Sequence, residues 1–177
     1  MFIEYDEEIE DIPKSILTIP FVSVILPIIW STNSILWIEE IDRTFYDSIK
    51  RIKNAYQELY PHFKFKGTVV TAKTIYNSYE IERESIQLFS GGLDANATYV
   101  RIKETNPILV NIYGWFKHNV DRNDVYEQDK KDIREFAKQN RLMSNIIASN
   151  FATFIDSNKF DKEFKKKIGN GLWYGFQ

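Results

Sequence analysis

The chain has 177 residues with a net charge of −2 at pH 7, and 44% of its residues are hydrophobic and 15% aromatic. This length and apolar content allow one or two small domains with hydrophobic cores. The absence of cysteine excludes disulfides, thiolate zinc sites and a thiol nucleophile in this chain. The slightly acidic charge argues against a nucleic-acid partner.

The N-terminal third reads as an acidic, solvated end followed by strands. Residues 1–11 are acidic. Short strands are predicted over residues 15–19, 22–26 and 35–41, separated by turns at prolines and polar residues. The apolar run from Ile19 to Trp30 is about a dozen residues long and contains Pro20 and Pro27, which argues against a membrane span and a signal peptide. We therefore expect buried strands here, no membrane partner and a cytoplasmic location.

An amphipathic helix is predicted next. Apolar residues recur at three- and four-residue steps at Phe45, Ile49, Ile52, Tyr56 and Leu59. Asp42 or Thr44 can cap its start, and Pro61 ends it. Residues 68–76 alternate as a strand does, and the polar segment 77–84 marks a domain boundary. Residues 1–80 are thus predicted to form a small N-terminal α/β domain, in which we find no catalytic motif.

From residue 84 onward, strands alternate with helices. Strands are predicted over residues 86–89, 108–113 and 144–148. Helices are predicted over residues 95–104, from Asp124 to Asn140, and around Phe160 and Phe164. This alternation implies right-handed crossovers and a parallel sheet, so residues 84–177 are predicted to form a second α/β domain.

The segment Ser90-Gly91-Gly92-Leu93-Asp94 stands between the first of these strands and its helix. Two glycines allow a tight turn with positive φ that leaves backbone N–H groups uncovered. The helix that follows directs its positive end toward the same point. This order favours binding of a phosphate or pyrophosphate, and a fixed S-G-G-x-D pattern arises by chance at only about 2 × 10⁻⁵ per position. The alternative is a ligand-free glycine turn in which Asp94 caps the helix.

The residues Leu88-Phe89-Ser90-Gly91-Gly92-Leu93-Asp94 resemble the PP-loop of the ATP pyrophosphatases, S-G-G-x-D-[ST]. Within that family the chain is most similar to the 7-cyano-7-deazaguanine synthase-like proteins. The resemblance covers residues 84–177 and is sharp only at the loop. It implies a partial doubly wound parallel sheet of the PP-loop (HUP-like) type. It also implies ATP and Mg²⁺ as cofactors, and adenylation of a carboxylate or carbonyl substrate with release of AMP and pyrophosphate.

The same resemblance assigns roles to individual residues. Pyrophosphate would be held by Ser90, Gly91, Gly92 and Leu93. The catalytic residue would be Asp94, which would also lie near Mg²⁺. The adenine would be bracketed by Leu88, Phe89, Tyr113 and Gly114. Lys117 and His118 are candidates to reach phosphate or substrate, with an ordinary surface loop as the alternative.

Two departures from the family weaken the expectation of catalysis. Ala95 stands where the family has Ser or Thr, and one lost hydrogen bond to a charged group is worth roughly 1.5–3 kcal/mol. The cysteine zinc site of the deazaguanine synthases is also absent. Two alternatives therefore stay open. One is a non-catalytic nucleotide-binding or assembly subunit, for example of a bacterial defence system. The other is an interaction domain whose turn binds nothing.

The family's sheet continues beyond the three strands that the sequence predicts here. Its strand order is 3-2-1-4-5, and its ligand crevice lies where that order reverses. The first predicted strand is therefore expected at a sheet edge. We expect the chain to be the N-terminal portion of a longer enzyme, or a short form whose edge is covered by a partner chain or a second copy.

Overall fold

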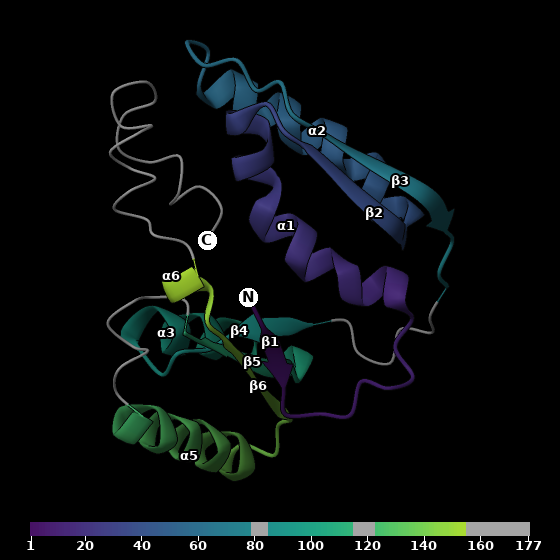
Figure 1. Cartoon of the computed structure of the whole chain (residues 1–177). Helices are drawn as coiled ribbons and strands as arrows, with labels where there is room; N and C mark the ends of the chain where they lie inside the picture. Colours follow the sequence, from purple (N-terminus) through teal and green to yellow (C-terminus); the bar gives the residue numbers. More distant parts are fainter. Residues whose placement is uncertain (79–84, 115–122, 155–177) are drawn as a thin grey trace. The chain divides into compact units, whose positions relative to one another are not determined.

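The computed structural model describes residues 1–78, 85–114 and 123–154 of an α/β protein (Figure 1). These residues form two compact units. One unit comprises residues 10–78, and the other comprises residues 1–9 together with the described residues from 85 to 154. We call them the α1–β3 unit and the β4–β6 unit and describe each by itself.

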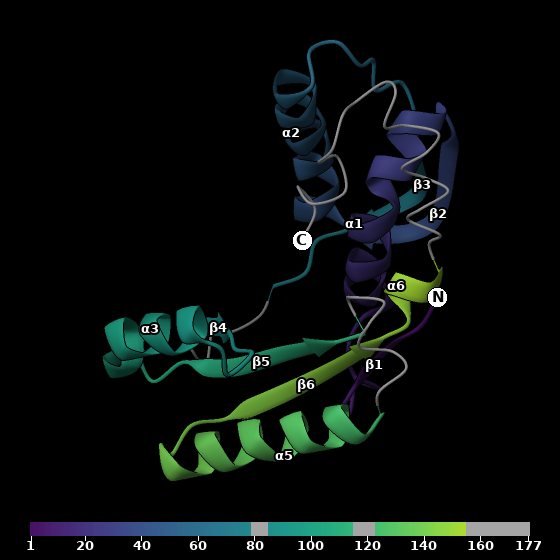
Figure 2. The same cartoon turned by 90° about the vertical axis from the view of Figure 1, so that its left-hand side faces the viewer.

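The α1–β3 unit contains two helices and two strands. These are α1 (Lys14–Thr32), β2 (Ile35–Asp42), α2 (Arg43–Leu59) and β3 (Thr68–Ile75). The two strands run parallel, with Leu36 opposite Val69, and both helices lie on one side of them (Figure 2). The core between the layers contains Val22, Leu26 and Trp30 from α1. The strands predicted near 35–41 and 68–76 and the helix between them are thus confirmed.

Helix α1 corrects the prediction of two short strands over residues 15–26. The segment is one continuous helix with Pro20 and Pro27 inside it. An interior proline costs about 3 kcal/mol. Full burial of an aliphatic side chain returns about 1.5–3 kcal/mol, and α1 buries Val22, Leu26 and Ile29, in addition to Trp30. The free energy gained by burial therefore outweighs the cost of the two prolines. Because α1 is apolar on every side, its sequence lacks the periodicity by which an amphipathic helix is predicted.

The length of α1 also corrects the argument that its apolar run is too short and broken for a membrane span. Among the described residues, α1 is one helix that is long and apolar enough to cross a membrane by length and composition. A core helix of a soluble protein and a signal sequence near the N-terminus meet the same criterion. In this structure α1 supplies Leu26 and Trp30, each only 1% exposed, to the core of its unit.

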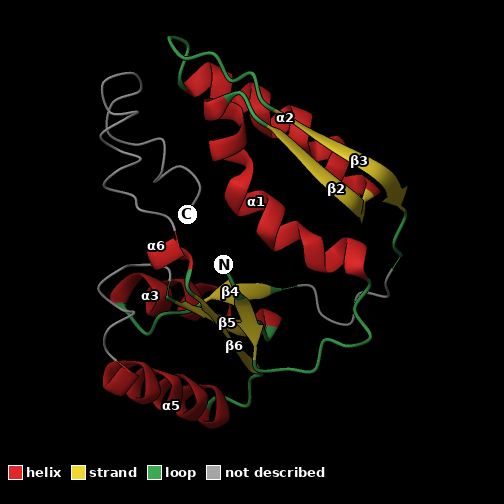
Figure 3. Ribbon diagram, viewed as in Figure 1, coloured by secondary structure: helices red, strands yellow, loops and turns green. Residues whose placement is uncertain are grey.

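The β4–β6 unit is built on a four-stranded sheet in the order β1-β6-β5-β4 (Figure 3). Its strands are β1 (Ile3–Tyr5), β4 (Ile86–Leu88), β5 (Ile108–Tyr113) and β6 (Ser144–Ser149). Its helices are α3 (Leu93–Ile102), η1 (Lys103–Thr105), α5 (Asn123–Gln139) and α6 (Phe151–Phe154). Strands β4, β5 and β6 are parallel to one another, as predicted, while β1 is antiparallel to β6. Within the described residues β4 lies at the sheet edge, also as predicted.

One face of this sheet carries the unit's core. Phe89 and Leu109 from the strand side pack with Ile133 and Ala137 of α5, and Tyr99 of α3 packs against the same cluster. Both helices therefore cover the same face. Right-handed crossovers produce this arrangement when successive strands are added in one direction. The third helix predicted around Phe160 lies outside the described residues.

Strand β1 requires a correction to the predicted domains. Residues 1–80 were expected to form one domain with a solvated acidic end, yet Ile3 pairs with Ser149 and Tyr5 with Ile147. Asp6 adds two contacts to the same unit. Its carboxylate accepts a hydrogen bond from the backbone N–H of Ile146 at 2.8 Å and forms an ion pair with Arg134 at 3.0 Å. The first nine residues therefore belong with the C-terminal strands.

Candidate anion-binding turn

The turn between β4 and α3 starts at the carboxyl edge of the parallel sheet. Phe89 is the last residue held by the sheet, since its N–H donates to the carbonyl oxygen of Val110 at 2.8 Å. Its side chain is buried and stacks on Phe136 with ring centroids 4.8 Å apart. The side-chain amide of Asn111 donates to the carbonyl oxygen of Phe89 at 3.0 Å. In a planar trans peptide the C=O and the next N–H point in opposite directions, so the N–H of Ser90 points away from Asn111.

The two glycines of the turn have different conformations. Gly91 has φ of +75°, which disfavours any residue with a side chain, as the sequence predicts. Gly92 is the N-cap of α3, with φ of −73° and ψ of 173°, and makes no side-chain capping bond. Asp94 lies in the first turn of α3. The prediction that Asp94 is the N-cap is therefore wrong, and its carboxylate lies in the first turn, close to the positive helix end.

Asn96 fixes the direction of the turn's peptide groups. Its side-chain amide donates to the carbonyl oxygen of Gly91 at 2.8 Å and to that of Gly92 at 3.0 Å. Both carbonyls thus face the helix. By the same peptide geometry the N–H groups of Gly92 and Leu93 point away from Asn96. Adjacent N–H groups turned outward at a helix N-terminus are the usual backbone arrangement for an oxyanion.

The backbone donors of the turn are free within the described residues. Among these residues, no hydrogen bond has the N–H of Ser90, Gly91, Gly92, Leu93 or Asp94 as its donor. All five residues are exposed, and the side chain of Leu93 is 85% exposed. The donors of the turn are therefore open to a ligand from solvent.

A pocket of about 300 Å³ lies beside the turn, on the α5 side. It is lined by Phe89, Ser90, Gly91, Asn96, Asp129, Asp132, Ile133 and Phe136. Asp129 and Asp132 place two carboxylates there, and one oxygen of Asp132 accepts a hydrogen bond from Gln128 at 2.6 Å. An unscreened phosphate in this pocket would be repelled by both carboxylates. A cation between them and the phosphate would remove that repulsion.

Ala95 is held by a buried amide. The side chain of Gln87, only 5% exposed, donates to the carbonyl oxygen of Ala95 at 2.6 Å. Its other atom, Oε1, is buried without a hydrogen-bond partner among the described residues. The hydrogen bond from Gln87 to Ala95 links the first turn of α3 to β4. Ala95 itself brings no hydroxyl group to the turn.

Tyr113 and Gly114 have partners in α5 and β6. The ring of Tyr113 stacks on Tyr126 of α5 with centroids 3.8 Å apart. Gly114 has φ of +80°, and a Cβ atom there would lie 1.7 Å from the carbonyl oxygen of Ser149. The strand-end turn and its close approach to β6 therefore account for this glycine without a ligand.

The turn thus contains the predicted residues Ser90 to Asp94, whereas Leu88 is the last residue of β4. Tyr113 and Gly114 have their partners in α5 and β6. Leu88 is 67% exposed, on the face opposite to that of Phe89. The sequence did not predict the roles of Asn96 and Asn111, because no sequence motif marks an amide side chain that orients a backbone carbonyl. Lys117 and His118 lie outside the described residues.

Comparison of the chain with protein-family models, with curated proteins and with solved structures finds no match. The geometry of the turn is therefore the observation from which a function can be proposed.

Proposed function

We propose that the β4–α3 turn binds the phosphates of Mg·ATP and that the β4–β6 unit is the nucleotide-binding part of a PP-loop ATP pyrophosphatase. Such an enzyme would adenylate a carboxylate or carbonyl substrate and release AMP and pyrophosphate, as 7-cyano-7-deazaguanine synthase-like proteins do. The sheet would then be part of a doubly wound sheet of the HUP-like type. The observation that supports the proposal most is the outward direction of the Gly92 and Leu93 N–H groups, set by Asn96.

Three further features support a magnesium-bound nucleotide. The turn follows a parallel strand at its carboxyl end, where open α/β sheets bind ligands. Asp94 supplies one exposed carboxylate at the helix start, and Mg²⁺ is usually held by one or two carboxylates together with substrate phosphates. Asp129 and Asp132 make the adjoining pocket negative, which favours the magnesium complex over the free anion.

Isothermal titration with Mg·ATP tests the proposal. The informative variant is Gly92→Val. The backbone angles of Gly92 suit any residue, and the nearest atom to an added Cβ is the Ser90 hydroxyl oxygen at an ordinary 3.5 Å. We expect this variant to fold and to weaken Mg·ATP binding by about tenfold or more, or about 1.4 kcal/mol, because its side chain obstructs the N–H groups.

Thr98→Val is the matched control. Thr98 is exposed on the same helix, so this change adds the same kind of side chain away from the turn. The proposal would be refuted if the wild type and both variants had equal affinity, or if Mg·ATP did not bind at millimolar concentration. The remaining hypothesis would then be an interaction domain whose turn binds no ligand.

A non-catalytic nucleotide-binding or assembly subunit is the second candidate, and Ala95 favours it. The missing hydroxyl removes one donor where the PP-loop family has Ser or Thr. The edge position of β4 in the described sheet would suit pairing with a partner chain or a second copy. Phosphorus NMR of the protein with Mg·ATP separates the two candidates. AMP and pyrophosphate indicate the enzyme, and binding without either product indicates the subunit.

A further inference from the structure

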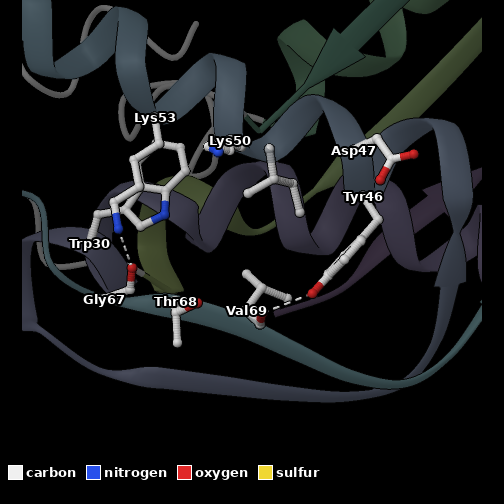
Figure 4. A pocket seen from close by; sticks show the side chains of 9 residues that line it. Trp30, Tyr46, Asp47, Lys50, Lys53, Gly67, Thr68 and Val69 are labelled. Atoms are coloured by element: carbon white, nitrogen blue, oxygen red, sulfur yellow. Dashed lines mark hydrogen bonds between the residues drawn. The ribbon is translucent and has the colours of Figure 1, made fainter.

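The α1–β3 unit contains a pocket of about 390 Å³ between α2 and the start of β3 (Figure 4). The residues that line it include Trp30, Tyr46, Ile49, Lys50, Lys53 and Val69. Of the lining residues that α2 supplies, Tyr46, Ile49, Lys50 and Lys53 are spaced as one helical face. Trp30, Ile49 and Val69 are buried and form an apolar floor. The volume falls within the range of small-molecule sites.

The charge of the pocket is positive. Asp47 is the one carboxylate among the described residues of its lining, and it is paired with Arg43 at 2.7 Å. Among the described residues, neither Lys50 nor Lys53 has a carboxylate within ion-pair distance. Two ammonium groups therefore stand at an apolar floor without a counter-ion from the described chain.

Lys53 is the more constrained of the two lysines. Its Nζ donates to the backbone carbonyl oxygen of Gly67 at 2.6 Å (Figure 4). An ammonium group has three donors, and no second acceptor for Lys53 exists among the described residues. Partial burial lowers the pKa of Lys53, because desolvation disfavours the charged form. An anion placed beside Nζ would satisfy the remaining donors and offset that cost.

The other lining residues favour a particular shape for the uncharged part of such an anion. Tyr46 lies at the opposite end of the pocket, where its hydroxyl group donates to the carbonyl oxygen of Val69 at 3.5 Å (Figure 4). Aromatic side chains and flat apolar surface favour a planar ligand. A ring placed on this apolar floor would bring a charged substituent near Lys53.

We propose that this pocket binds a small aromatic anion, with its ring on the apolar floor and its charged group at Lys50 and Lys53. The site lies in the α1–β3 unit and is separate from the β4–α3 turn, so it adds a second ligand to the proposed function. A carboxylate and a phosphate monoester share the required chemistry. The comparison of two probes, 1-naphthoate and 1-naphthyl phosphate, distinguishes them.

Heteronuclear NMR titration of the full chain tests the site. We expect both anionic probes to shift the Lys53 side-chain and Val69 backbone signals, and the probe that binds more tightly identifies the charged group. The neutral 1-naphthamide should bind at least fivefold more weakly. Equal binding of the neutral and anionic probes, or shifts that leave Lys53 and Val69 unmoved, would overturn the proposal.

The variant Lys53→Met provides an independent test, because methionine keeps much of the apolar stem and removes the charge. We expect at least a fivefold loss of 1-naphthoate affinity. Lys66→Met, at an exposed lysine outside the pocket lining, is the matched control and should bind as the wild type does. Equal losses in both variants would contradict the site. If Lys53→Met does not fold, Lys50→Met is measured in its place with the same expectation.

Discussion

The side-chain amide of Asn96 lies 2.8 Å from the carbonyl oxygen of Gly91 and 3.0 Å from that of Gly92. One side chain thus holds two successive carbonyls of the turn toward the helix. It is a positioning residue, because its effect on a ligand acts through the backbone N–H groups that follow those carbonyls.

Replacing Asn96 with alanine should weaken Mg·ATP binding about tenfold, since each lost hydrogen bond is worth about 0.5–1.5 kcal/mol. Calorimetric titration measures the effect. Thr98→Ala on the same helix is the control and should bind normally. Unchanged affinity in Asn96→Ala would show that the turn keeps its direction without the amide.

The carboxylates beside the turn predict a dependence on magnesium. The double variant Asp129→Asn, Asp132→Asn removes the negative charge of the pocket. We expect it to raise the affinity for ATP in the presence of a chelator by about two- to fivefold, an effect that high salt reduces. Its affinity for Mg·ATP should change less. A variant whose affinity for metal-free ATP equals that of the wild type would show that the phosphates lie elsewhere.

Gly114 and Gly91 should respond differently to alanine. Both have positive φ, but a Cβ at Gly114 would overlap the Ser149 carbonyl, whereas nothing lies within 4 Å of a Cβ at Gly91. Gly91→Ala should cost about 1–2 kcal/mol of unfolding free energy. Gly114→Ala should cost about 2–5 kcal/mol. Urea unfolding measures both, and an equal cost would mean that β5 and β6 separate easily at this end.

Asp42 should stabilise the α1–β3 unit as the cap of α2. Its carboxylate accepts hydrogen bonds from the N–H of Phe45 at 2.8 Å and from Asn77 at 2.9 Å. Asp42→Ala should therefore lower the free energy of unfolding by about 0.5–2 kcal/mol for the cap alone. Asp47→Ala, at an exposed position on the same helix, is the control with a smaller expected loss. Thermal unfolding compares the two.

The same carboxylate predicts a loss of stability in acid. Burial alone would raise the pKa of Asp42, but the hydrogen bonds from Asn77 and from the backbone N–H groups outweigh it, so the pKa lies below its ordinary value of 3.8. A lowered folded-state pKa stabilises the fold above that ordinary value, and the contribution is lost as the pH falls further. Unfolding followed from pH 6 downward should show a weaker decline in Asp42→Asn than in the wild type.

The sequence was sufficient to predict the secondary structure of the amphipathic and alternating segments. Helix α2 and strand β3 were predicted because their apolar residues repeat with the period of the element they form. Helix α1 was missed since its even apolarity has no such period, and the prolines suggested breaks that core burial overrides. Strand β1 was missed because three residues in an acidic end become a strand only through pairing with β6.

For the turn, local chemistry predicted the positive φ of Gly91 and the helix that follows. It could not supply the direction of the peptide groups, which depends on Asn96 and on Asn111 from the next strand. Nor could it place Asp129 in the same pocket as Ser90, because the two residues come from different elements.

The pairing of Ile3 with Ser149 has a consequence during synthesis. At about 5–20 residues per second, a ribosome needs roughly 7–30 s to add the residues that separate β1 from its partner strand. The α1–β3 unit emerges in that interval and can fold first. Strand β1 therefore stays without its partner strand until β6 has been synthesised.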